Sequence, residues 1–135
     1  MKLVLDSNIL FAAAIRDSVT RKIISDSTEE FFIIPMNYEE LEEHKEELIK
    51  KSKIGRVGFE LILEQITRKC IFIEDGSLAG YWQKAKKIMD EIDPDDTPFI
   101  AAALAIKADI WSDDPHFDEQ RVVKIWKTHQ LINKI

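Results

Sequence analysis

Acidic side chains recur at the points in this sequence where an apolar segment ends or begins. Asp6 closes the first aliphatic run of the chain, and Asp113 and Asp114 follow a later one. Asp95 and Asp96 stand just before a third apolar segment. A fourth acidic group follows soon after an apolar run that a proline ends, and it comprises Glu39, Glu40, Glu42 and Glu43.

Clustered carboxylates are suited to binding divalent cations. Ionised carboxylates a few ångströms apart repel one another, and removing them from water adds a further penalty of several kcal/mol per ion. Such a cluster is stable when its members share protons or bind a cation. Mg²⁺ and Mn²⁺ are natural choices because these hard ions take carboxylate and water oxygens. A site with two ions about 3.5–4 Å apart can activate water and stabilise the leaving oxygen of a phosphodiester.

The elements that must bring these carboxylates together follow from the hydrophobic pattern. We predict five strands, over residues 2–6, 31–34, 70–73, 109–112 and 122–126. We predict helices over residues 8–16, 18–27, 37–52, 54–68, 78–91, 99–107 and 128–133. Strands separated by helices indicate an α/β fold, a parallel sheet of four to five strands with helices on both faces. Because ligands bind at the carboxyl ends of such strands, the acidic groups are expected to converge there.

The length and composition fit one globular domain over residues 1–135. Hydrophobic residues make up 45% and charged residues 33% of the chain, which excludes a disordered or fibrous protein. A single cysteine, Cys70, excludes an intramolecular disulfide and a zinc site built from several cysteines. No apolar run approaches the roughly 20 residues that span a bilayer. We therefore expect a cytoplasmic protein that makes no contact with a membrane.

The net charge of −6 is unfavourable for indiscriminate nucleic-acid binding, which needs a basic surface. If four of the carboxylates bind cations, the remainder of the protein is much closer to neutral. The charge therefore permits RNA as a partner, and it predicts weak and salt-sensitive affinity.

Four segments together resemble the PIN-domain nucleases, in the order and at the spacing of that family. They are residues 3–10, 40–41, 96–103 and 111–117. The first has the pattern strand–Asp–Ser–Asn, and the last has the pattern strand–Ser–X–Asp–X–X–Phe. The resemblance extends over nearly the whole chain and implies a three-layer PIN-like fold.

The resemblance also implies a set of site residues. The residues that it implies as catalytic, binding one or two Mg²⁺ or Mn²⁺ ions, are Asp6, Glu40, Asp96 and Asp114. The supporting residues around them are Ser7, Asn8, Ser112, Asp95 and Asp113. Asp114 is preferred to its neighbour because Phe117 follows it by three residues, and Asp96 is preferred because the apolar helix follows it.

The function that these residues predict is a metal-dependent endoribonuclease that cleaves RNA phosphodiester bonds by metal-activated water. Members of this size include toxins that pair with antitoxins, so the expected partners are single-stranded RNA and an antitoxin protein. A homodimer is also expected, with Phe59 or Leu63 in its interface. The alternative is a catalytically inactive PIN-like module that binds RNA or protein.

Some of these candidate residues also have purely structural interpretations. Asp96 could simply cap the following helix, a role worth about 1 kcal/mol, and Asp114 before a proline could be ordinary turn chemistry. His116 is interpreted as a structural or surface residue because the histidines show no paired metal spacing.

Two other classes of protein with acidic sites are disfavoured by the sequence. An aspartyl-nucleophile phosphatase would need a second aspartate at position 8, where this chain has Asn8. A receiver domain would need a lysine at the end of the last strand, whereas Lys124 lies inside that strand.

Overall fold

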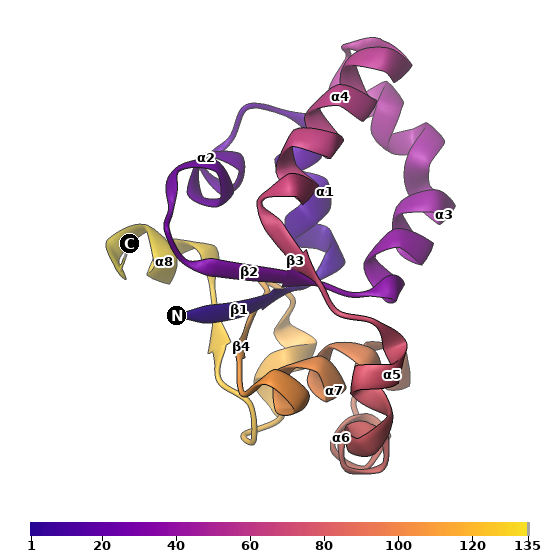
Figure 1. The fold of residues 1–135 in the computed structure, drawn as a ribbon, viewed down its shortest axis with the longest axis vertical. Coiled ribbons are helices and arrows are strands. Elements are labelled where there is room, and N and C mark those ends of the chain that lie inside the picture. The colour runs from indigo at the N-terminus through magenta and orange to yellow at the C-terminus, as the bar shows by residue number, and fades with distance from the viewer. Residues whose placement is uncertain (135) are drawn as a thin grey trace.

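A computed structural model describes residues 1–134 of the chain, which form a five-stranded parallel sheet between two layers of helices (Figure 1). The strands are β1 (Lys2–Leu5), β2 (Glu30–Ile33), β3 (Cys70–Phe72), β4 (Asp109–Trp111) and β5 (Ile125–Trp126). Their order in the sheet is β3-β2-β1-β4-β5, and every pair is parallel. The predicted α/β fold, a parallel sheet with helices on both faces, is confirmed.

Two groups of helices cover opposite faces of the sheet (Figure 1). One face carries α1 (Ser7–Ile15), α2 (Val19–Asp26), α3 (Pro35–Ser52), α4 (Gly55–Arg68) and α8 (Thr128–Lys134). The other carries α5 (Asp75–Leu78), α6 (Trp82–Met89) and α7 (Thr97–Ile106). The short 3₁₀ turns are η1 (Ala79–Tyr81), η2 (Pro94–Asp96) and η3 (Pro115–Glu119).

The central strands are apolar on both sides because helices cover both faces of the sheet. Successive side chains of a strand point to opposite faces, so each strand contributes to both cores. In β1, Leu3 and Leu5 belong to the core beneath the first group of helices, and Val4 belongs to the core beneath the second. The sheet order then places β1 beside β4, although more than 100 residues separate them in sequence. This pairing decides which acidic groups meet.

The buried face of α4 differs from the one that its apolar pattern predicts. That pattern places Val57, Leu61, Ile62 and Ile66 on the buried side, but Val57 and Leu61 are 72% and 55% exposed. Phe59, expected in a dimer interface, is fully buried, and Ile66 is buried on the same side of the helix. Phe59 and Ile66 are seven residues apart, two helical turns, whereas Val57 lies two residues from Phe59 and hence on the far side. A dimer interface through Phe59 is therefore wrong.

Two elements are shorter than predicted. The helix expected over 78–91 is divided by η1, which contains Gly80, a residue that weakens an α-helix. The strand expected over 122–126 shrinks to β5 because the Gln120 side chain accepts hydrogen bonds from the backbone N–H groups of Val122 and Val123. Within the described chain, none of the helices is long and apolar enough to cross a membrane.

Candidate functional site

Asp6 anchors the site at the carboxyl end of β1, at the start of α1. Its backbone N–H donates to Trp111 O at 3.1 Å, which continues the pairing of β1 with β4. Its side chain is 5% exposed, and Oδ2 accepts a hydrogen bond from Ser112 Oγ at 2.7 Å. Ser112 Oγ in turn accepts from the backbone N–H of Asp114 at 3.0 Å. One buried hydroxyl therefore links two of the predicted carboxylate residues.

Glu40 reaches the same region from the first turns of α3. Its Oε1 accepts a hydrogen bond from Ser7 Oγ at 2.8 Å, and Ser7 is buried next to Asp6 in sequence. The roles expected of Ser7 and Ser112 match these contacts, since each hydroxyl fixes one carboxylate. The Asn8 side chain, by contrast, is exposed at the start of α1.

Asn37 is a site residue that the sequence reasoning missed. It is fully buried, and its Nδ2 donates to Leu5 O and to Ser7 Oγ, both at 3.1 Å. Its Oδ1 accepts from the Ile34 backbone N–H at 2.8 Å. Asn37 thus ties the end of β1 to the start of α3 and positions the serine that holds Glu40. The available signal was an amide at the third position of a helix that begins with proline, where a side chain caps the preceding backbone.

Replacing Asn37 with alanine should lower the free energy of unfolding by about 2–3 kcal/mol, because it leaves two buried backbone groups without their partner. Urea unfolding of wild type and variant measures the change. Asn8→Ala is the matched control, since its side chain is exposed and its loss should cost less than about 0.5 kcal/mol. Equal losses in the two variants would show that Asn37 does not brace the site.

Asp96 stands at the end of η2, directly before α7. Its Oδ2 is buried and has no hydrogen-bond partner within residues 1–134. The turn before it is held by Asp93, whose Oδ1 accepts from the Asp95 backbone N–H at 3.1 Å. Asp95 itself is exposed, so the residue that supports this turn is Asp93, which the sequence analysis did not single out.

The adjacent carboxylates of Asp113 and Asp114 have different hydrogen-bond partners. Asp114 Oδ1 accepts from the His116 backbone N–H at 2.9 Å and lies 3.4 Å from His116 Nδ1. Asp113 Oδ1 and Oδ2 instead accept from the backbone N–H and the hydroxyl of Thr128, at 2.8 and 2.6 Å. Asp113 therefore caps α8, and the structure does not bring it into the cluster.

His116 is closer to the acidic groups than its sequence context suggested. Its Nδ1 lies 3.4 Å from Asp93 Oδ2, the same distance as from Asp114. One ligand atom from each of Asp93, Asp96 and His116 lies within 4.8 Å of the others, a spacing compatible with a metal ion. Asp93 and His116, which are not among the four predicted ligands, therefore lie close to Asp96.

The pKa values of three of the predicted carboxylates, Asp6, Glu40 and Asp96, are raised by burial and by the charges of their acidic neighbours. Burial, followed by repulsion from Asp114, raises the pKa of Asp6, although the hydrogen bond from Ser112 opposes the change. Burial, and less strongly the Asp6 charge, raises the pKa of Glu40. Burial raises the pKa of Asp96 to about 7, and the charges of its acidic neighbours contribute to the rise. The neighbours that repel Asp96 are Asp93, Asp6, Asp114 and Glu40.

A family model for the PIN domain matches residues 4–134. The chain belongs to the PIN domain family. PIN domains are generally nucleases and typically use divalent metal ions. A solved structure with the same fold is that of VapBC2 from Rickettsia felis, bound to a DNA fragment from its own promoter. The match has a TM-score of 0.70 and 14% sequence identity, and covers 94% of this chain and 98% of that one. None of the curated proteins matches this PIN domain in sequence.

The side chains of this PIN domain fit a divalent cation. Asp96 presents a buried oxygen that has no partner among the described residues, beside other carboxylates whose repulsion raises its pKa. An ionised oxygen in that position is costly unless a positive charge meets it. The donor set consists mainly of carboxylate oxygens, which suit Mg²⁺ and Mn²⁺. These ions are therefore compatible with the site as the chain builds it.

Proposed function

We propose that this PIN domain, residues 1–135, is an endoribonuclease that depends on one or two Mg²⁺ or Mn²⁺ ions. Asp6, Glu40, Asp96 and Asp114 would hold the ions. The observation that carries the proposal is the unpartnered, buried Asp96 oxygen, which faces repulsion from the other three carboxylates. Family membership supports nuclease chemistry, and the donor set supports hard divalent ions.

A bound divalent ion would lower the pKa of a water molecule and offset the charge of the phosphodiester. The chain's own contribution is to hold the ligands still. Ser112 fixes the Asp6 carboxylate, and Ser7 fixes Glu40, each through one hydroxyl hydrogen bond. Asp96, with a pKa of about 7, would retain a proton on a fraction of molecules near neutral pH, and it would hold an ion only in its deprotonated form.

The proposal extends to partners. The fold shared with VapBC2 supports a toxin role, in which an antitoxin protein binds this chain. The substrate that we propose for that toxin is single-stranded RNA. A homodimer, if formed through α4, would use its exposed apolar residues Val57 and Leu61 in place of the buried Phe59.

The test is cleavage of short single-stranded RNA by purified protein with Mn²⁺ or Mg²⁺. Wild type should cleave with either ion, EDTA should stop the reaction, and Asp6→Asn should be inactive. Asp118→Asn should retain activity, because that carboxylate is 49% exposed and pairs with Lys127 at 2.9 Å. If wild type cleaves no more than Asp6→Asn, the nuclease proposal is wrong, and the chain is a binding module with the same fold.

A further inference from the structure

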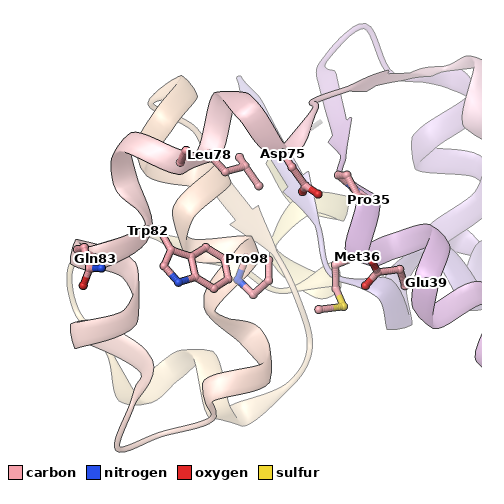
Figure 2. A pocket seen from close by; sticks show the side chains of 9 residues that line it. Pro35, Met36, Glu39, Asp75, Leu78, Trp82, Gln83 and Pro98 are labelled. Carbon is pink, nitrogen blue, oxygen red and sulfur yellow. The ribbon is translucent and has the colours of Figure 1, made fainter.

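A pocket of about 500 Å³ opens between the start of α3 and the segment formed by α5 and α6 (Figure 2). Two of its lining residues are close in sequence to proposed metal ligands. Glu39 directly precedes Glu40, and Pro98 follows Asp96 by two residues. The pocket therefore adjoins two segments that carry proposed ligands, and we expect a neighbouring nucleotide of an RNA held at the carboxylates to reach it.

The apolar walls of the pocket suit a flat aromatic group. The indole of Trp82 lies beside the Pro98 ring (Figure 2). The other apolar lining residues are Pro35, Met36, Leu78 and Ala79. Trp82 is 39% exposed, so a large part of its ring has no protein partner. Exposed aromatic side chains next to a nucleic-acid path act as stacking platforms for unpaired bases.

The polar groups of the pocket are mainly hydrogen-bond acceptors. Glu39 and Asp75 contribute exposed carboxylates, and Gln83 contributes an amide. An ionised carboxylate only accepts hydrogen bonds, so a bound base must present N–H donors. No lysine or arginine is among the lining residues within the described chain, which makes the pocket unsuitable for a phosphate group.

We propose that this pocket binds the base of a nucleotide next to the cleaved phosphodiester and prefers guanine. Guanine presents two adjacent donors, N1–H and the N2 amino group, to a single carboxylate. Uracil presents one N–H between two carbonyl oxygens, which the carboxylates would repel. The inference rests on the proposed nuclease function for its RNA substrate. A cationic side chain of a partner protein is the competing occupant, but it does not explain the flat walls formed by Trp82 and Pro98.

Cleavage of matched single-stranded RNAs that differ at one position, measured as kcat/KM, provides the first test. We expect guanine to be preferred over uracil by about ten-fold at one position next to the cut. Trp82→Ala should lower kcat/KM on the guanine substrate by about ten-fold, and Glu39→Gln should reduce the preference. Tyr81→Ala is the matched control, because Tyr81 is 41% exposed on the neighbouring turn but does not line the pocket. Metal-dependent cleavage without a base preference, or with a preference that Trp82→Ala and Glu39→Gln leave intact, would overturn the inference.

The second test does not require cleavage. Guanosine, but not uridine, should shift the Trp82 indole N–H resonance in the NMR spectrum of the wild-type protein, and Glu39→Gln should weaken that shift. This result in a protein that does not cleave RNA would contradict the nuclease proposal and support the pocket. A shift caused by an arginine-rich peptide, with none caused by guanosine, would overturn the pocket assignment in favour of a protein partner.

Discussion

Replacing Asp96 with asparagine should abolish RNA cleavage and, at the same time, stabilise the metal-free protein at pH 7.5. Loss of residues that merely orient metal ligands costs about 10–100-fold in activity or affinity, so loss of a ligand should cost more than about 100-fold. Stability should rise because the substitution removes a charge that burial and acidic neighbours disfavour. After allowance for solvent screening, the gain is about 1–2 kcal/mol.

Two measurements on the same preparations check this prediction, namely Mn²⁺-dependent cleavage and urea unfolding in EDTA. Asp118→Asn is the control, since it removes an exposed carboxylate and should change neither quantity by much. An Asp96→Asn variant that is both inactive and less stable than wild type would indicate that Asp96 is a structural cap, as its position before α7 also allows.

Raising the pH should lower the folding stability of the metal-free protein, and divalent ions should reverse the effect. The pKa of Asp96 is about 7 in the folded protein against an ordinary value of 3.8, and the pKa values of Asp6 and Glu40 are raised in the same direction. A raised carboxyl pKa means that the folded protein holds protons that the unfolded chain has released. The stability from these groups is therefore fully present below about pH 4 and is lost as the pH rises through 7.

Thermal unfolding at pH 5.5 and pH 7.5, with and without Mn²⁺, measures this dependence. Mn²⁺ should raise the Tm more at pH 7.5, where the carboxylates are ionised; saturation at 100 times the Kd adds about 2.7 kcal/mol. Asp96→Asn should flatten the pH dependence in EDTA and weaken the response to Mn²⁺. Identical pH profiles for wild type and Asp96→Asn would show that this carboxylate carries no repulsive charge in the fold.

Local patterns were sufficient to predict the fold class, and the resemblance to the PIN-domain nucleases singled out the four carboxylates that we propose as ligands. Short aliphatic runs followed by Asp6 or by Asp114 indicate strands that end at a ligand edge, and strands separated by helices indicate a parallel sheet. These features depend on neighbours in sequence, so they can be read without knowledge of the sheet order. The buried face of α4 was not determined in this way, because both Val57 and Phe59 are apolar and only packing distinguishes them.

The tertiary structure decided which side chains support the carboxylates and how costly their charges are. Asn37 donates to Leu5 O, which is 32 residues away, and Asp93 lies next to His116. Neither contact can be read from the sequence. The pairing of β1 with β4 brings Ser112 to Asp6 across 106 residues. Burial and repulsion among distant groups set the pKa of Asp96, and the pocket at Trp82 exists only because α3, α6 and α7 approach one another. Residue types and short spacings are local properties of the chain, whereas desolvation and charge repulsion depend on distances that only folding establishes.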